Sequence, residues 1–152
     1  MGMYTGLAFK AIIKPEFRKY KCIYTPDLSD YDYDGLLYWM KTDVEKFTEF
    51  GKNDRSCMIP TGYSAYFDDY LYDDTMDIDV QQAHPSYNEE TGEWQVYCSL
   101  KNYDHEIEKF FELMPYFIEK CDRIYYKHEY MSDPWYYKLE NGKIVQIEDW
   151  HS

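Results

Sequence analysis

The middle of this 152-residue chain lacks basic residues. No Lys or Arg lies between Arg55 and Lys101, whereas nine Asp and Glu residues do. The segment up to Arg55 is balanced at nine bases and nine acids, and the segment from Lys101 onward has seven bases and eleven acids. The formal net charge of −13 is therefore concentrated in one central segment. Such a local excess favours binding to a basic surface and disfavours direct contact with DNA, RNA or anionic lipid.

Signals for membranes and secretion are missing as well. No apolar run approaches the roughly 18 residues of a membrane-spanning helix, and no basic region followed by an apolar stretch opens the chain. The cysteines form no C-x-x-C pair, which disfavours a zinc ribbon and thioredoxin chemistry. They are Cys22, Cys57, Cys98 and Cys121. We expect four free thiols in a cytoplasmic protein that binds no membrane.

Motifs for catalysis and for cofactor binding are also lacking. The glycines form neither G-x-G-x-x-G nor a P-loop, no serine lies in a G-x-S-x-G setting, and the histidines form no H-E-x-x-H arrangement. A dyad of Cys98 with His105 or His128 would need a tertiary contact, and the apolar alternation around Cys98 favours a buried, inert thiol. The sequence therefore favours a binding protein over an enzyme, and we expect no cofactor and no metal ion.

The composition favours one folded domain. Hydrophobic residues make up 45% of the chain and aromatic residues 20%, which argues against disorder despite the charge. Nineteen residues are tyrosines, a residue type suited to strands and to interfaces. We therefore expect a single domain over residues 1–152 that is rich in strands.

Alternation of apolar and polar residues predicts the strands. The pattern is clearest over Tyr4–Ile13 and Trp94–Leu100. Further strands are predicted over Ser56–Ile59, Met76–Val80 and Ile124–Met131. The dipeptide at 141–142, Asn-Gly, predicts a tight hairpin between two more strands, at 135–139 and 143–147.

Helical periodicity is strongest over Asn102–Lys120. Asn102 or Asp104 is placed to cap the first turn, and Pro115 predicts a kink or a break. A capping box at Thr42–Glu45 predicts a second, shorter helix with Thr42 as its N-cap.

These elements together predict an α+β domain. In it, a mostly antiparallel sheet is packed by two or three helices. The predicted core combines the inward face of one strand with one helix and the hairpin. Its members are Trp94, Val96, Cys98, Leu100, Phe110, Phe111, Met114 and Leu139.

The candidate partner-binding surface is the acidic, aromatic stretch at the centre of the segment without bases. Its residues are Asp68, Asp69, Tyr70, Tyr72, Asp73, Asp74, Asp77 and Asp79. Closely spaced carboxylates imitate the charge row of a phosphate backbone, which attracts Lys and Arg grooves, and tyrosines supply contact area. We expect a non-enzymatic inhibitor that occupies a basic, nucleic-acid-binding surface of a protein partner.

Three alternatives remain open. Asp77 and Asp79, about 6.6 Å apart on one strand face from a rise of ~3.3 Å per residue, suit a metal-dependent hydrolase together with His84. An aromatic pocket would suit a small ligand. Its candidate lining residues are Trp39, Tyr97, Trp135 and Tyr137. A surface rich in tyrosine also suits a self-assembling structural protein.

In length, acidity and richness in Tyr and Asp, the chain resembles small accessory proteins of phages and mobile elements that inhibit host defences. The likeness is one of class and centres on Phe67–Asp79. Some of those proteins act as nucleic-acid mimics. The resemblance implies an anti-defence role and a basic protein partner, such as a host nuclease or another nucleic-acid-binding protein.

Overall fold

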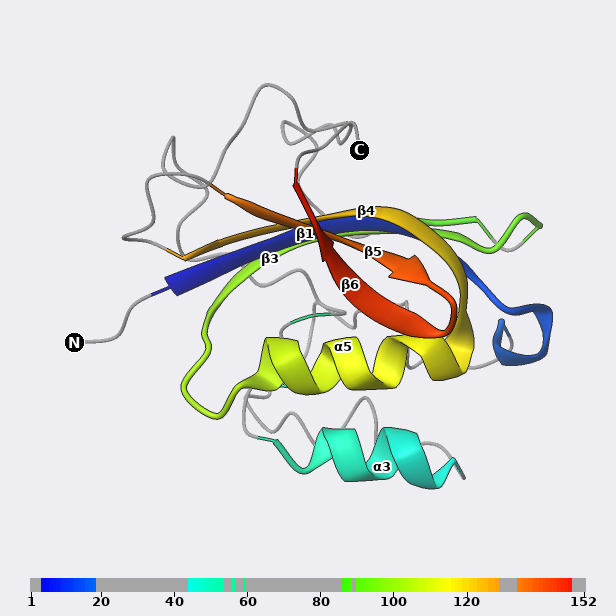
Figure 1. Ribbon diagram of the computed structural model, residues 1–152. Coiled ribbons are helices and arrows are strands. Elements are labelled where there is room, and N and C mark those ends of the chain that lie inside the picture. Colours follow the sequence, from blue (N-terminus) through cyan, green and yellow to red (C-terminus); the bar gives the residue numbers. More distant parts are fainter. Residues whose placement is uncertain are drawn as a thin grey trace.

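A six-stranded antiparallel sheet organises the protein (Figure 1). The computed structural model describes residues 4–18, 44–53, 56, 59, 86–88, 90–128 and 134–148. Its long strands are β1 (Tyr4–Ile13), β3 (Glu93–Lys101) and β4 (Ile118–His128), with β1 between the other two. The prediction of a strand over Tyr4–Ile13 is confirmed at both ends.

Shorter strands extend the sheet on both sides. The short β2 (Ser86–Tyr87) pairs with β3, whereas β5 (Trp135–Glu140) pairs with β4 and with β6 (Lys143–Ile147). The strand order is therefore β2-β3-β1-β4-β5-β6. Asn141 and Gly142 join β5 to β6 with φ angles of 53° and 76°, the two positive values that a type I′ turn requires. The predicted hairpin is confirmed.

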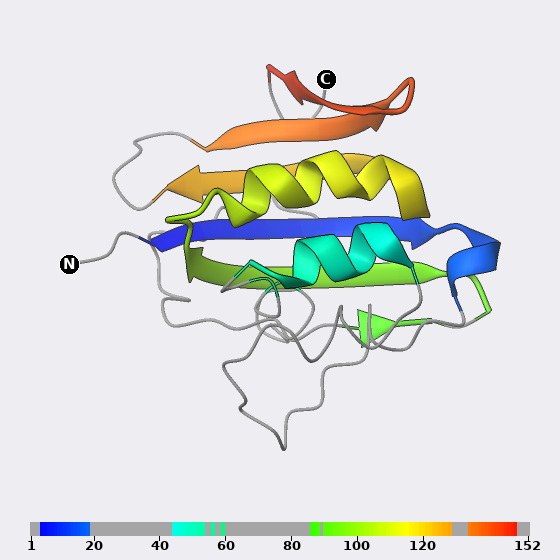
Figure 2. The same cartoon turned by 90° about the horizontal axis from the view of Figure 1, so that it is seen from below.

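Two helices cover one face of this sheet in the described part of the chain. They are α3 (Glu45–Gly51) and α5 (Glu106–Phe117), and a single 3-10 turn, Pro15–Phe17, follows β1. Figure 1 shows both helices below the sheet, and Figure 2 shows them side by side in front of it. This arrangement confirms the predicted α+β fold. None of the described helices has the length and apolar character needed to cross a membrane.

Aromatic rings fill the layer between the sheet and the helices. The ring centroid of Phe9 on β1 lies 5.3 Å from that of Trp94 on β3 and 5.8 Å from that of Phe110 on α5. Phe47 brings α3 into the same layer through Phe117, at 5.3 Å. All five side chains are fully buried. Aromatic pairs at these separations add to the large stabilisation that burial of their surface provides.

Most of the predicted core is confirmed, and two of its members lie at the margin. The fully buried residues are Trp94, Val96, Cys98, Leu100, Phe110 and Met114. Phe111 and Leu139 are only partly buried and pack against the core from its edge. Phe111 differs from Phe110 because successive helix residues point about 100° apart, since an α-helix has 3.6 residues per turn.

The helix predicted over Asn102–Lys120 is shorter at both ends in the structure. It ends at Phe117, two residues after Pro115, which has no N–H to donate to the helical ladder. Lys14 supplies partners at this end: its Nζ donates to the Pro115 carbonyl oxygen at 3.2 Å, and its backbone N–H donates to that of Phe117 at 2.9 Å. Ile118 is already extended, so β4 begins six residues earlier than predicted.

The predicted N-cap of α3 is wrong. The helix begins at Glu45, after Val44 in an extended conformation, rather than after Thr42. The carbonyl oxygen of Val44 accepts the backbone N–H groups of Phe47 and Thr48, both at 3.1 Å. The first turn is therefore closed by the backbone of Val44, whose own side chain makes no capping hydrogen bond.

The strand predicted over Ser56–Ile59 is wrong at its two described residues, Ser56 and Ile59. Ser56 lies in a turn, where its backbone N–H donates to the Asn53 carbonyl oxygen at 3.1 Å, and Ile59 is helical. The end of α3 sets this turn, because the Asn53 side chain donates to the Phe50 carbonyl oxygen at 2.8 Å. The strand predicted over Met76–Val80 lies outside the described residues.

The two neighbouring phenylalanines of α5 offer a stability test. Phe110→Ala removes a fully buried ring from the central aromatic layer, and we expect the free energy of unfolding to fall by about 3–5 kcal/mol. Phe111→Ala removes a partly buried ring, and we expect a loss of about 1–2 kcal/mol. Urea unfolding of both variants measures the difference. Equal losses would contradict the helix phase described above.

Candidate functional site

The predicted partner-binding residues lie outside the part of the chain that the structure describes. These are Asp68, Asp69, Tyr70, Tyr72, Asp73, Asp74, Asp77 and Asp79. The alternative metal ligand His84 and the pocket candidate Trp39 lie outside it as well. The structure therefore does not test these predictions. The residues that it does describe are called the scaffold below.

The described scaffold is almost neutral. It contains 12 Lys and Arg and 13 Asp and Glu, out of 16 and 29 in the whole chain. The residues outside the described ranges consequently hold 4 bases and 16 acids. Nearly all of the net charge of −13 therefore belongs to segments other than the described strands and helices.

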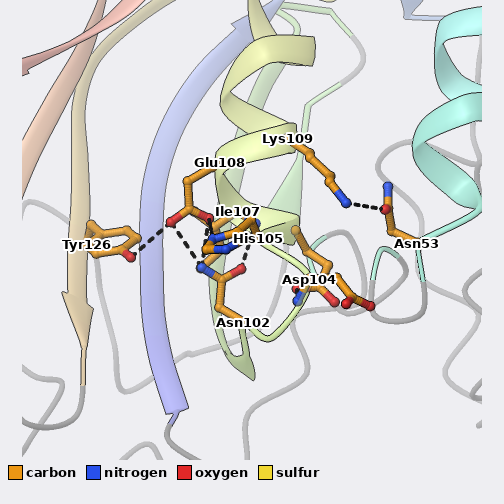
Figure 3. Close-up of polar contacts among 9 residues, drawn as sticks. Asn53, Asn102, Asp104, His105, Ile107, Glu108, Lys109 and Tyr126 are labelled. Carbon is orange, nitrogen blue, oxygen red and sulfur yellow. Dashed lines mark hydrogen bonds and ion pairs between the residues drawn. The ribbon is translucent and has the colours of Figure 1, made fainter.

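In the described scaffold, polar contacts gather at the start of α5 (Figure 3). The Glu108 carboxylate is their centre. Its Oε1 accepts the phenol of Tyr126 at 3.2 Å, and Asn102 Nδ2 donates to Oε1 at 3.1 Å and to Oε2 at 2.8 Å. Tyr126 belongs to β4 and Asn102 directly follows β3, so one carboxylate connects three segments of the chain.

Asn102 uses both ends of its side-chain amide. While Nδ2 donates to Glu108, Oδ1 accepts the backbone N–H of Ile107 at 2.9 Å and so satisfies a donor of the first helical turn. Asn102 is thus the capping residue of the two predicted. The other, Asp104, instead donates its backbone N–H to the Glu106 carboxylate at 3.3 Å. The N-cap position itself is held by His105, whose side chain makes no capping hydrogen bond, so α5 begins at Glu106 and not at Asn102.

His105 marks the bend between the loop and the helix. Its φ of 59° places it in the left-handed region, which is uncommon for a residue other than glycine. The imidazole Nδ1 lies 3.9 Å from Glu108 Oε2, and the side chain is 75% exposed. An imidazole exposed to this degree is not placed to activate the fully buried Cys98 thiol. One turn along the helix, Lys109 Nζ donates to Asn53 Oδ1 at 2.9 Å and connects α5 to α3.

An aromatic cluster adjoins the Glu108 carboxylate. Tyr126 and Trp135 face each other across β4 and β5, and their rings stack with centroids 5.8 Å apart and planes 12° apart. Tyr137 lies on the same sheet face, with its centroid 5.9 Å from that of Tyr126 and 4.9 Å from that of Phe111. Trp135 remains 47% exposed. Two of the predicted ligand-lining residues, Trp135 and Tyr137, therefore do come together.

The carboxylate also acts on the neighbouring phenols. Burial raises the pKa of Tyr126, and the charge of Glu108 and the hydrogen bond to it raise this pKa further. Burial and the charge of Glu108 likewise raise the pKa of Tyr137. Both phenols therefore remain protonated at neutral pH, and Tyr126 acts as a donor to Glu108.

The described part of the chain contains two free cysteines and no cluster of metal ligands. There, no three His, Cys, Asp or Glu residues are arranged to hold a metal ion. Cys98 and Cys121 are free and buried, and burial raises the pKa of both thiols. A protonated, inaccessible thiol is a poor nucleophile.

No family model matches the chain, and neither a curated protein nor a solved structure does. Its charge distribution and its site geometry are therefore the grounds for a function.

The Tyr126–Glu108 contact predicts a pH effect. Because the pKa of Tyr126 is raised in the folded state, its contribution to stability is fully present below the ordinary tyrosine pKa of about 10 and is lost as the pH rises through the higher folded value. Between the ordinary pKa of about 10 and the higher folded pKa, the free energy of unfolding falls by up to about 1.4 kcal/mol per pH unit for this group. We expect Tyr126→Phe to show a shallower decline above about pH 10. Urea unfolding at several pH values measures it, with Tyr103→Phe, at an exposed tyrosine, as the control.

The buried thiols predict slow alkylation. We expect iodoacetamide to leave Cys98 and Cys121 unmodified in the folded protein and to modify both in urea, because the reagent needs an accessible thiolate. Peptide mass spectrometry distinguishes the two states. Rapid labelling of either residue in the folded protein would contradict the burial described above.

Proposed function

We propose that the protein is a non-enzymatic acidic binding protein that occupies a basic surface of a protein partner. One observation carries the proposal: nine acids and no Lys or Arg lie between Arg55 and Lys101, whereas the residues that the structure describes hold 12 bases and 13 acids. A coat that served solubility alone would be spread over the described strands and helices as well. The concentration of acid, and its mixture with tyrosines, supports a dedicated interaction surface.

The partner's surface is one that normally holds nucleic acid. Such surfaces present Lys and Arg at spacings matched to phosphates, and a row of carboxylates competes for the same cations. The candidate residues remain the eight between Asp68 and Asp79. Charge attraction accelerates encounter, whereas tyrosine contact area holds the complex together. A cytoplasmic nucleic-acid mimic that inhibits a nuclease, or another nucleic-acid-binding protein, fits this chemistry.

A second candidate, a small-ligand-binding protein, is favoured by the aromatic cluster beside Glu108. Trp135 is half exposed, and a carboxylate adjoins the cluster. Aromatic walls with few polar groups are typical of ligand sites. The cluster is equally compatible with the first proposal, because aromatic residues are also common at the centres of protein interfaces.

A charge-reversal experiment tests the proposal. The variant Asp73→Lys, Asp74→Lys, Asp77→Lys and Asp79→Lys reverses four candidate carboxylates. A matched control reverses four exposed scaffold carboxylates and so changes the net charge equally. Its substitutions are Glu16→Lys, Glu112→Lys, Glu119→Lys and Glu148→Lys. Both variants and the wild type are used for capture from a lysate of host cells, with the bound proteins identified by mass spectrometry.

We expect the wild type and the scaffold variant to capture the same basic protein at low salt. The Asp73–Asp79 variant should lose it, because its local field is reversed. High salt should weaken wild-type capture, since exposed charges are screened over about 8 Å at physiological ionic strength. Undiminished capture by the Asp73–Asp79 variant, or equal loss in both variants, would contradict the proposal.

A further inference from the structure

We infer that Trp135, Tyr126 and Glu108 form a recognition site for an arginine side chain. The inference rests on the proposed function in one respect, namely that the arginine belongs to the basic protein partner. It adds a short-range site in the folded scaffold to the acidic segment. The site combines an exposed aromatic face with a fixed carboxylate, the two groups that a guanidinium contacts best.

Trp135 provides the aromatic face. The residue is 47% exposed although it belongs to the helix-covered side of the sheet, and the Tyr126 ring stacks on its ring at 5.8 Å. Tryptophan attracts cations more strongly than the other aromatic side chains. Cations of this chain already lie over other rings, with Lys46 over Tyr116 at 4.7 Å and Lys101 over Tyr4 at 5.5 Å. In the described part of the chain, no cation lies over Trp135.

Glu108 provides the charge. Three hydrogen bonds from Asn102 and Tyr126 fix its carboxylate, and the side chain is still 45% exposed. A carboxylate has about four acceptor positions, so capacity remains for a further donor. Neither Lys109 nor His105 donates a hydrogen bond to it. Lys109 is engaged by Asn53 at 2.9 Å, and His105 stands at 3.9 Å from Oε2.

Tyr126 joins the two parts of the site. Its ring contacts Trp135 and its hydroxyl contacts Glu108, so one residue of β4 positions both groups. A planar guanidinium stacks on an aromatic face while its N–H groups reach an acceptor, whereas the ammonium of lysine is a compact, strongly hydrated charge. Arginine is therefore favoured over lysine. A neutral ligand such as a sugar would use the ring and leave the charge of Glu108 unused.

Nuclear magnetic resonance with a minimal probe tests the site. N-acetylarginine methylamide, with one guanidinium and no other charge, is titrated into the labelled full-length protein at physiological salt, and N-acetyllysine methylamide is the comparison. The indole N–H signal of Trp135, assigned by its loss in Trp135→Phe, and the backbone N–H signals of residues 106–109 report binding. We expect saturable shifts of both sets of signals, and tighter binding of arginine than of lysine.

Matched variants separate this site from general acidity. Glu108→Gln should weaken arginine binding by about three- to tenfold, because it removes a charged acceptor and preserves the volume of the side chain. Glu112→Gln removes the same charge from an exposed position one turn further along α5, and should stay within about twofold of the wild type. Trp135→Leu should abolish saturable shifts at residues 106–109. Unfolding curves show whether each variant preserves the fold. Trp135→Phe, which retains a ring, is the conservative comparison for Trp135→Leu.

Two results would overturn the inference. One is the absence of a saturable arginine shift at Trp135, and the other is an equal loss of affinity in Glu108→Gln and Glu112→Gln. The probe needs none of the residues between Asp68 and Asp79. If the Asp73–Asp79 variant captures its partner normally while arginine still binds at Trp135, the proposed function fails and the arginine site stands.

Discussion

Burial of Phe110 against Phe9 and Trp94 is the contact on which the rest of the described structure depends. It fixes the rotation of α5 about its own axis, because Met114 and Phe117 follow on the same buried face. Once that face points to the sheet, the flank that carries Glu108 and Phe111 must lie toward β4 and β5, since residues three apart share one side of a helix. The position of the carboxylate is thus a consequence of how the core packs.

Local sequence signals were sufficient wherever the structure is decided by neighbours in the chain. The strand at 4–13 and the hairpin at Asn141-Gly142 follow from alternation and from turn chemistry. The ends of α5 do not, because Asn102 caps it from outside and Lys14, 101 residues away from Pro115, closes it. The start of α3 differs from the prediction for a similar reason, since the N-cap residue is Val44, which closes the first turn with its backbone carbonyl and not with its side chain.

The candidate site shows the same division. The concentration of acid near Asp73 is plain in the sequence, because charge needs no fold to be counted. The Glu108–Tyr126 contact could not be predicted from the sequence, since the two residues are 18 positions apart and meet only when α5 packs on β4. Trp135 and Tyr137 were among the predicted ligand-lining residues. Their alternation on one strand is a signal that the sequence contains. The sequence contains no signal that places the Glu108 carboxylate beside them.

The near-neutral scaffold has a physical consequence for how the two proposed surfaces would work together. The described residues carry little self-repulsion among their own charges, because their 12 bases and 13 acids almost balance. On the proposed function, the acidic segment acts at long range and is screened by salt.

The arginine site proposed at Trp135 would act only at contact. Its carboxylate is held in advance by Asn102 and Tyr126, so little conformational freedom is lost when a cation binds. If both proposals hold, long-range charge governs how often the partner arrives. The proposed contact beside Glu108 then governs how long the partner stays, since contacts of this kind act mainly on dissociation.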